Sequence, residues 1–490
     1  MTEKQRSPRV VVIGAGLSGI ALGRELLRAG HDDFVILEKG EDVGGVWNWN
    51  HYPGLTCDVP SALYQYSWDT NPGWSRTFAT GPEIQRYHRD VAERHGILAH
   101  VRLNSEVVAA HRGDDGWTVR TADGATFEAD FVVAATGVLH HKNIPDFPGL
   151  DSFAGTVVHS VDWDDAIEVD GKRVAVVGTG STGVQLVSAL QQRAAHVTNL
   201  LRTPQWVLWA PTEVAQPLPV RALLKYVPLL DQAVHQVSIG ASSLYTDVVT
   251  KPSWRRRLVR RAAEAHLRTI RDPELRRMMT PDYEPLCKRQ VVSGTFYRAI
   301  QQPNVSVVTD DIERFVPEGI VTADGTLHEL DVVLLATGFK AHNYMRPMDL
   351  IGRDGLTIDE AWEKGTYAYR MSALPGFPNL FMIMGPNAPV ASLPQHWTAE
   401  RSSEHIVAWL DRWARREFDT VEPTVEATER FNAQVKDALG PTVWNTGCNS
   451  WYLKDDGSVD LWPFDRTTTK RWFARPDHAD YSFTTNGTYA

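Results

Sequence analysis

The sequence predicts an α/β fold with two Rossmann-like dinucleotide-binding domains, because one glycine fingerprint occurs twice, each time after a β-branched apolar run. The first copy is VVVIGAGLSG and the second is RVAVVGTGSTG. Their glycines are Gly14, Gly16 and Gly19, and Gly178, Gly180 and Gly183. Such a turn leads a strand into a helix whose N-terminus receives a pyrophosphate. One copy alone is often only a tight turn, whereas two copies in matching contexts are a strong signal.

The charge that follows each fingerprint distinguishes the two sites. Glu38 follows Gly19 by 19 residues, and Arg202 follows Gly183 at the same spacing of 19. A carboxylate at this position accepts hydrogen bonds from an unphosphorylated ribose, whereas a guanidinium pairs with a 2′-phosphate. The first site is therefore predicted to bind FAD, and the second to bind NADPH.

Apolar strands with a repeated ending predict how the two units are connected. In the first unit we expect strands at 9–13 and 34–38, with a helix between them. The apolar runs at 131–137 and 331–339 both contain an Ala-Thr-Gly turn. In flavoproteins with two dinucleotide sites, such turns mark where the chain crosses between the domains. The NADPH unit is therefore predicted to be an insertion within a discontinuous FAD domain.

The predicted domain boundaries follow from these crossings. Residues 1–144 are the first part of the FAD-binding domain, 145–335 the NADPH-binding domain, and 336–490 the second part of the FAD-binding domain. The second part is expected to end, from residue 467 onward, in an aperiodic tail on the surface. Long amphipathic stretches predict a helical insertion in the NADPH domain, at about 211–283.

One stretch of this insertion suggests a packed helix with a basic outer side. Trp254, Leu258, Ala262 and Ile270 are spaced so that they could share a face. The arginines at 255–261 are interpreted as the solvated side of that helix. Contact of these arginines with a membrane surface is the less favoured alternative.

Composition excludes several classes of protein. The net charge of −10 argues against a nucleic-acid partner, and no apolar run is long enough to predict a membrane span. The scattered Cys57, Cys287 and Cys448 are expected to form neither a disulfide framework nor a metal site. The absence of a paired-cysteine motif excludes flavin disulfide reductases, which use a redox-active dithiol. We expect a cytoplasmic redox enzyme that uses two nucleotides.

Two long motifs carry a resemblance to a known family. They are GGVWNWNHYPGLTCD at 44–58 and FAGTVVHSVDWD at 153–164. Every defined position of the two fingerprints of type I Baeyer–Villiger monooxygenases is met in them, so the chain resembles that family. The resemblance extends through PLCKR at 285–289, GFPNLFMIMGPN at 376–387 and CNSWY at 448–452.

The resemblance implies roles for individual residues. Arg289 matches the family's active-site arginine, and Asp58 matches the carboxylate that pairs with it. Lys288 matches a residue that contacts the 2′-phosphate together with Arg202, and His159 a linker residue that couples domain movement. The residues expected to bind the cofactors are Gly14, Gly16, Gly19, Glu38, Gly45, Val46, Trp47, Asp58, Tyr64, Val107, Gly178, Thr179, Gly180, Ser181, Thr182, Gly183, Arg202, Thr203, Lys288 and Trp451.

Among these residues, Trp47 and Tyr64 resemble flavin-contacting positions, and Val107 is expected beside the adenine. Trp451 resembles the tryptophan of a mobile loop that folds over bound NADP. No metal ligand is predicted. The oligomeric state, monomer or homodimer, is left open.

The resemblance implies an FAD enzyme that consumes NADPH and O2 and converts a ketone to an ester or lactone through a C4a-peroxyflavin. An N- or S-oxygenating flavin monooxygenase is the nearest alternative, although Trp163–Asp164 at the end of the linker motif favours ketone oxidation. A redox-sensing protein that only holds nucleotides is a third possibility. The presence of both Arg289 and Asp58 argues against a sensor, because a sensor has no need to stabilise a peroxide.

Overall fold

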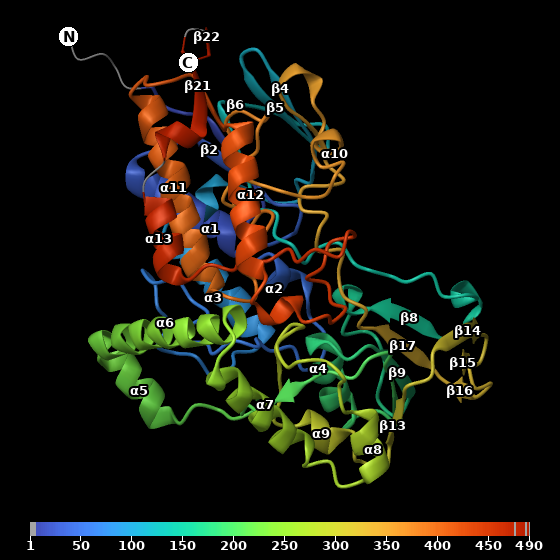
Figure 1. Ribbon diagram of the computed structural model, residues 1–490. Helices are drawn as coiled ribbons and strands as arrows, with labels where there is room; N and C mark the ends of the chain where they lie inside the picture. The colour runs from blue at the N-terminus through green and yellow to red at the C-terminus, as the bar shows by residue number, and fades with distance from the viewer. Residues whose placement is uncertain (1–5, 475–476, 486–487, 490) are drawn as a thin grey trace.

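Two five-stranded parallel sheets organise the protein, whose computed structural model describes residues 6–474, 477–485 and 488–489. The first sheet, in the upper half of Figure 1, has the order β19-β7-β1-β2-β3. Its strands are β1 (Val10–Ile13), β2 (Phe34–Leu37), β3 (Val101–Arg102), β7 (Phe131–Ala134) and β19 (Leu380–Met382). This sheet combines strands from the N-terminal part of the chain with one that follows the second nucleotide unit.

The second sheet lies at the lower right of Figure 1 and has the order β13-β10-β9-β17-β8. Its strands are β8 (Thr156–His159), β9 (Arg173–Val177), β10 (His196–Leu200), β13 (Val305–Val308) and β17 (Val332–Leu335). All neighbouring strands in both sheets run parallel, as expected for strands covered by helices on their faces. The predicted α/β class with two dinucleotide-binding units is confirmed.

Each fingerprint leads into a helix, as predicted. The first is α1 (Leu17–Ala29), which ends at Gly30 in a left-handed conformation with φ 81°. The second is α4 (Ser181–Leu190). The other α-helices outside the insertion are α2 (Val46–Trp49), α3 (Gly81–Arg94), α8 (Pro273–Met278), α9 (Phe296–Ala299), α10 (Ile358–Ala361), α11 (Gln395–Ala414), α12 (Val425–Leu439) and α13 (Arg466–Ala474). Short 3-10 turns are η1 (Ile97–His100), η2 (Leu150–Ser152), η3 (Ser160–Asp162), η4 (Arg353–Gly355), η5 (Val443–Asn445) and η6 (His478–Asp480).

Smaller sheets complete the two halves. One contains β4 (Val107–Gly113), β5 (Gly116–Thr121), β6 (Thr126–Ala129) and β18 (Asp349–Ile351). Another contains β14 (Ile312–Val316), β15 (Gly319–Thr322) and β16 (Leu327–Glu329). The remaining strands are β11 (Val207–Leu208) with β12 (Val291–Val292), and β20 (Thr420–Pro423) with β21 (Tyr481–Thr485) and β22 (Thr488–Tyr489).

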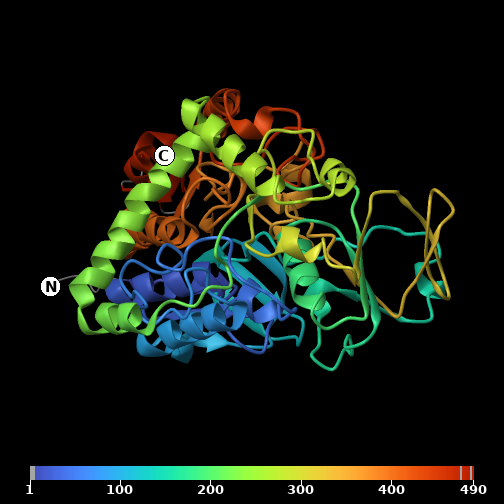
Figure 2. The same ribbon diagram turned by 90° about the horizontal axis from the view of Figure 1, so that it is seen from below.

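The helical insertion contains α5 (Leu218–Tyr226), α6 (Pro228–Thr250) and α7 (Trp254–Leu267). Seen from below, α6 runs along one side of the molecule (Figure 2). None of the helices in the described part of the chain is both long and apolar enough to cross a bilayer.

The helix face predicted for α7 is wrong. Trp254, Leu258 and Ala262 are exposed, whereas Ile270 is buried and lies beyond the end of the helix. The buried face includes His266, whose Nδ1 lies 2.9 Å from a carbonyl oxygen of β11. Packing against β11 therefore determines which side of α7 is buried, and local spacing could not reveal that contact.

The prediction of an aperiodic surface tail is also wrong for the described residues. Part of the segment forms α13, which packs on α11 and buries Phe473. Further on, β21 pairs antiparallel with β20, and Tyr481 packs 4.6 Å from the ring of Trp409. Residues 475–476, 486–487 and 490 of this segment lie outside the described residues. Contacts with α11, far away in sequence, therefore order a segment without its own periodicity.

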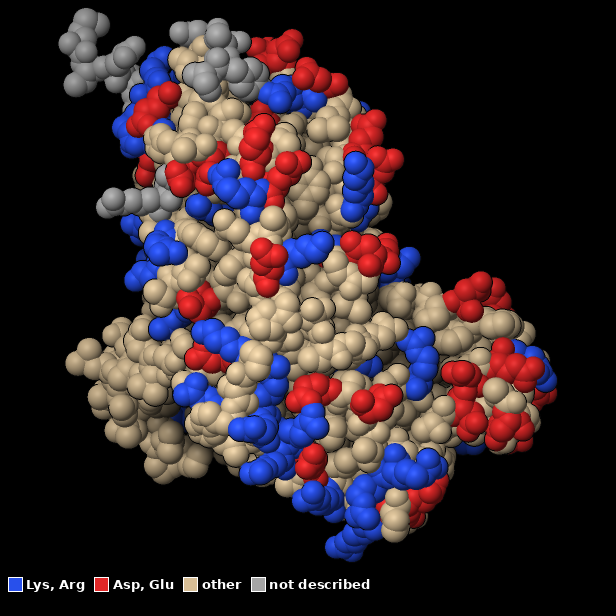
Figure 3. All heavy atoms as spheres, in the orientation of Figure 1, with Lys and Arg blue, Asp and Glu red and all other residues tan. Residues whose placement is uncertain are grey.

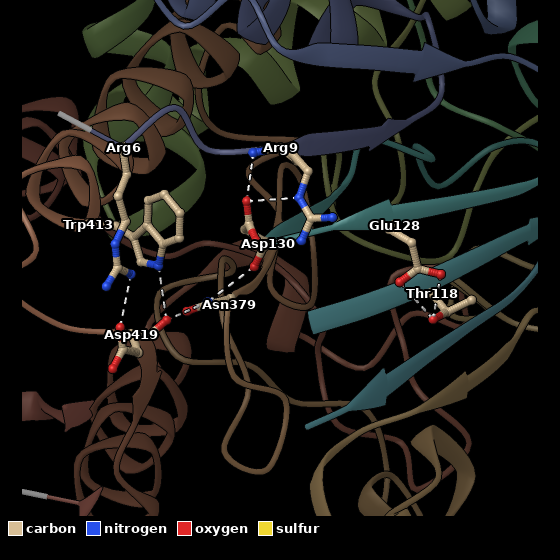
Figure 4. A network of polar contacts seen from close by, with 8 residues as sticks. All are labelled: Arg6, Arg9, Thr118, Glu128, Asp130, Asn379, Trp413 and Asp419. Carbon is tan, nitrogen blue, oxygen red and sulfur yellow. Dashed lines mark hydrogen bonds and ion pairs between the residues drawn. The ribbon is translucent and has the colours of Figure 1, made fainter. Parts of the chain in front are cut away.

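A buried asparagine joins three parts of the FAD half (Figure 4). Asn379, just before β19, is 2% exposed and has a φ of 62°. Its Nδ2 donates to the carbonyl oxygens of Asp130 and Asp419, both at 3.1 Å, and its Oδ1 accepts from the backbone N–H of Val421 at 2.9 Å. One side chain thus connects the starts of β7, β19 and β20.

Asn379→Ala should lower the free energy of unfolding by about 2–4 kcal/mol, because three hydrogen bonds disappear and their buried partners remain. Alanine also tolerates a positive φ less well than asparagine. Chemical denaturation followed by tryptophan fluorescence measures the change. Thr118→Ala is the control, because its hydroxyl bonds Glu128 on an exposed surface at 3.1 Å. Equal stability losses in the two variants would contradict the prediction.

Candidate functional site

One cavity of about 1500 Å³ is lined by the segments that follow β1, β7, β9 and β17. Ligands bind at the carboxyl ends of parallel strands in such folds. The sequence-predicted residues that line it are Gly14, Gly16, Glu38, Gly45, Val46, Trp47, Asp58, Tyr64, Val107, Gly178, Thr179, Gly180, Ser181, Thr182, Arg202, Thr203, Lys288, Arg289 and Trp451. Residues more than 400 positions apart therefore meet around one space.

Gly19 and Gly183 have a different role from the other glycines. A Cβ atom on Gly19 would lie 2.0 Å from the carbonyl oxygen of Gly14, and one on Gly183 would lie 2.2 Å from that of Gly178. These glycines therefore allow each helix to pack closely on its turn. At Gly180 a Cβ would meet no atom within 4 Å, so space is free at the start of α4. That geometry fits a pyrophosphate.

Glu38 stands at the end of β2, as expected. Its carboxylate is 4% exposed and accepts hydrogen bonds from the backbone N–H groups of Ala15 at 2.7 Å and Gly40 at 2.8 Å. These bonds orient the carboxylate along the cavity wall. An ionised carboxylate has about four acceptor positions, so capacity for ribose hydroxyls remains.

The second site brings two cations together. Burial and the neighbouring charge of Arg202 lower the pKa of Lys288, whose Nζ lies 4.5 Å from the ring centroid of Tyr283. In the described part of the chain, neither cation forms an ion pair with a carboxylate. Two cations that repel each other beside a glycine turn fit a doubly charged 2′-phosphate, which would relieve the repulsion.

Aromatic residues form part of the cavity wall. The Nε1 of Trp47, on α2, donates to the hydroxyl of Tyr64 at 2.9 Å, and the two rings meet edge to face at 5.6 Å. The ring of Trp451 contacts that of Tyr452 at 4.6 Å. This aromatic wall suits a planar ring system.

Asp58 contacts the second nucleotide site. The hydroxyl of Ser181, the first residue of α4, donates to its Oδ2, and its Oδ1 is buried without a partner in the described protein. Burial raises the pKa of the Asp58 carboxyl, and the charge of Arg289 and the Ser181 hydroxyl offset part of the rise. No ion pair joins Asp58 to Arg289 among the described residues. The direct pairing that the sequence suggested is therefore not formed here.

Arg289 is fixed by groups that sequence reasoning missed. Its Nη1 donates to the carbonyl oxygen of Val390 at 2.5 Å, and it also hydrogen-bonds the hydroxyl of Tyr452. Burial alone would lower the pKa of Arg289, yet the facing Tyr452 and Asp58 raise it above its ordinary value. Burial also raises the pKa of Tyr452 to about 12, so its hydroxyl stays protonated. Arg289 is thus a permanent cation at the cavity wall.

Tyr245 of α6 is another lining residue that the sequence did not reveal. Its only signal is the spacing of Ser238, Ala241, Ser242 and Tyr245, which all line the cavity. This is the period of one helix face. Since many amphipathic helices show the same spacing, the sequence could not distinguish a cavity wall from a packed core.

His159 lies at the end of β8 and is 2% exposed. Its Nδ1 accepts from the backbone N–H of Val161 at 3.3 Å, so the proton belongs on Nε2, which lies 3.1 Å from the carbonyl oxygen of Gly338. Burial lowers the pKa of His159, which favours the neutral ring. The imidazole therefore holds the linker against the second Ala-Thr-Gly turn.

The expectation that the cysteines form no disulfide is wrong. Cys287 and Cys448, 161 residues apart, are joined by a disulfide with Cα atoms 6.1 Å apart. Cys57 is free and buried. The disulfide joins the segment of Arg289 to the segment of Trp451. Only the fold brings these two sulfurs together, so their spacing in sequence could not predict the pair.

Thiol counting checks this disulfide. Unfolded, unreduced protein should react with one equivalent of an alkylating reagent at Cys57, and reduced protein with three, as read by mass spectrometry. Folded protein should react slowly, because burial raises the pKa of the Cys57 thiol to about 12. Three reactive thiols in unreduced, unfolded protein would rule the disulfide out.

Comparison with known proteins gives consistent matches. Residues 11–218 match the family model described as pyridine nucleotide-disulphide oxidoreductase. An uncharacterized monooxygenase of Mycobacterium bovis is 49% identical over 459 residues, which is 94% of this chain and 92% of that protein. A Baeyer–Villiger monooxygenase of Streptomyces coelicolor is 36% identical over 479 residues, which is 96% of this chain and 92% of that protein.

Solved structures have the same architecture. Cyclohexanone monooxygenase from Rhodococcus sp. Phi1 bound to NADP+ superposes with a TM-score of 0.87 at 29% identity, covering 98% of this chain and 99% of that one. The protein named OTEMO, in complex with FAD and NADP, gives a TM-score of 0.87 at 25% identity, covering 99% of this chain and 100% of that one.

Proposed function

Because this chain belongs to the type I Baeyer–Villiger monooxygenases, within the flavin-containing monooxygenase superfamily, we propose that it converts a ketone to an ester or lactone. The observation that carries the proposal is the position of Arg289. Its guanidinium lies at the wall of a cavity bordered by both nucleotide sites. A fixed cation is what oxygen insertion beside a carbonyl requires, because negative charge develops on oxygen.

The protein is an NADPH-dependent flavoprotein monooxygenase with FAD and NADPH as cofactors. FAD that has been reduced by NADPH activates O2. We propose that Gly14, Gly16 and Glu38 hold the FAD pyrophosphate and ribose. In the second site, Gly180 admits the NADPH pyrophosphate, and Arg202, Lys288 and Thr203 surround its 2′-phosphate.

The remaining site residues orient and protect the reacting groups. Arg289 stabilises the negative oxygen as it adds to the ketone carbonyl, and Tyr452 positions the guanidinium. Asp58 adds a negative charge that keeps Arg289 protonated and oriented. Trp451 covers the cavity on the NADP side and excludes water, which would otherwise allow H2O2 to escape.

We propose the chain division 1–144, 145–335 and 336–490 as two functional units that move against each other. NADPH must first approach the flavin and then leave room for the ketone, so a hinge is needed. The bond between His159 and Gly338 supports a hinge at the crossings between the sheets. Because the imidazole is buried with both nitrogens engaged, it acts through position and not through proton transfer.

The proposed substrates are a small-molecule ketone and O2, and the proposed assembly is a monomer or homodimer. We place the enzyme in the cytoplasm, where NADPH is supplied. The name of the relative from Streptomyces coelicolor supports ketone oxidation over N- or S-oxygenation. Product analysis by mass spectrometry on cyclic, linear and aryl ketones, with an amine and a sulfide for comparison, tests this choice. Faster oxidation of the amine or sulfide than of every ketone would overturn it.

Arg289→Ala should lower the rate of ester formation by about 10²–10³-fold, the usual effect of removing one stabilising group from a developing oxyanion. FAD should remain bound, and any surviving NADPH oxidation should yield H2O2. Simultaneous measurement of NADPH, ester and H2O2 gives the result. Arg173→Ala is the matched control, because Arg173 pairs with Asp331 and Glu329 at the surface. Ester formation by Arg289→Ala at the control's rate would remove Arg289 from the mechanism.

Arg202→Ala combined with Lys288→Ala should raise the KM for NADPH at least about tenfold and leave that for NADH little changed. A charge-assisted hydrogen bond contributes about 1.5–3 kcal/mol, and exposure of Arg202 reduces its share. Steady-state kinetics with both nucleotides measures the preference. Arg193→Ala, which removes a surface partner of Asp170 in the same unit, is the control. An unaltered NADPH preference would disprove the assignment.

A further inference from the structure

The outer surface of α5 and α6 is apolar, although it is exposed and packs against no core of the described protein. We define the apolar lobe by Leu218, Leu223, Tyr226, Leu229, Val237 and Leu244, whose exposed fractions range from 52% to 79%. Helix α5 buries none of its residues. In Figure 3 the lobe at the lower left, formed by α5 and α6 in Figure 1, is almost wholly tan. A contiguous exposed apolar surface of this kind indicates an interaction site.

Helix α6 has two faces with different surroundings. The face with Ser238, Ala241 and Tyr245 lines the cavity. Val237 and Leu244, seven residues apart, lie on an exposed face about a quarter of a turn away. The fold therefore needs only the inner face, and the apolar character of the outer face has no explanation within the described protein.

Basic residues accompany the apolar lobe. Residues 214–262 contain eight Lys and Arg but only two Asp and Glu, although the whole chain has a net charge of −10. Of the two carboxylates, Asp231 is buried and Asp247 is paired with Lys251 at 2.9 Å. Arg257 and Arg261 of α7 are exposed and form no ion pair with any described residue. Blue side chains lie beside the tan lobe in Figure 3.

The charge pattern discriminates between possible occupants. A symmetric contact with a second copy of the chain would bring this basic surface against itself, which like-charge repulsion opposes. An anionic lipid surface would instead meet the cations with opposite charge and receive the leucines, Tyr226 and Trp254 at its interface. Exposed Trp254 and Leu258 on α7 stand one turn apart beside Arg257 and Arg261, which is the pattern of an interfacial helix.

We propose that the apolar lobe, together with the exposed start of α7, docks on an anionic lipid bilayer. The contact is peripheral, with the helices lying in the plane of the interface. The cavity-lining side of α6 then lies within one helix diameter, about 10 Å, of the lipid. The docking is independent of the ketone chemistry and would hold for any reaction in the cavity.

Vesicle sedimentation of the FAD-loaded protein tests the proposal. The protein should sediment with vesicles of equal parts phosphatidylglycerol and phosphatidylcholine, and much less with phosphatidylcholine alone. Raising the salt concentration should release it, because surface charges are screened. Failure to bind the anionic vesicles at low salt would overturn the proposal.

Paired variants locate the contact. Tyr226→Glu with Leu229→Glu should reduce the bound fraction at least about tenfold, since both side chains would otherwise enter the interface. Val425→Glu is the apolar control, because Val425 on α12 is also exposed, at 54%. All variants should keep FAD absorbance and NADPH oxidation in solution, which shows that they fold.

Arg257→Gln with Arg261→Gln should weaken binding to anionic vesicles and flatten its salt dependence. This pair leaves the apolar lobe intact, so it tests the charge separately. Lys470→Gln with Arg471→Gln, an exposed basic pair on α13, is the matched control. Unchanged vesicle binding in both test variants would refute the proposal. A dimer in solution that dissociates in the Tyr226→Glu with Leu229→Glu variant would also refute the proposal. The apolar lobe would then be an interface between copies of the chain.

Discussion

Hydrogen bonds between the loop at 52–58 and helix α4 join the two parts of the protein that line one cavity. The Tyr52 hydroxyl donates to Gln185 at 2.9 Å, the Gln185 amide donates to the Thr56 carbonyl at 3.0 Å, and Ser181 donates to Asp58. One partner in each bond belongs to the FAD half and the other to the second fingerprint helix. The first long motif therefore supplies contacts between the two halves.

Cationic side chains line the cavity that both halves form. Arg289 faces the cavity close to the Asp58 end of the loop, and Arg202 and Lys288 lie at the other nucleotide site. None of the three forms an ion pair with a described carboxylate, although acidic residues outnumber basic ones in the chain. The excess of acidic residues lies outside the surroundings of these three cations. The cations at the cavity therefore remain available to anionic groups.

The sequence predicted the features that depend on short spacing. Glu38, Arg202 and the glycine turns lie where expected, because a strand, a turn and a helix fix their distances locally. It could not place Tyr452 on Arg289 or Tyr245 at the cavity, since those contacts join distant segments. The same limit explains why the buried face of α7 and the order of the C-terminal tail were predicted wrongly. Contacts with β11 determine the first, and contacts with α11 determine the second. Nor did the sequence reveal that the Ser181 hydroxyl donates to Asp58, because this contact also joins distant segments.

The bond between Cys287 and Cys448 closes a covalent ring through both halves of the molecule. The ring contains β13 and β17 of one parallel sheet and β19 of the other. A ring of this size removes about 5 kcal/mol of loop-closure entropy from the unfolded chain, in the chain-entropy account. A backbone cut inside it would leave one molecule and not two fragments. Any rotation of one sheet against the other must therefore carry the Arg289 and Trp451 segments together, as a single tethered piece.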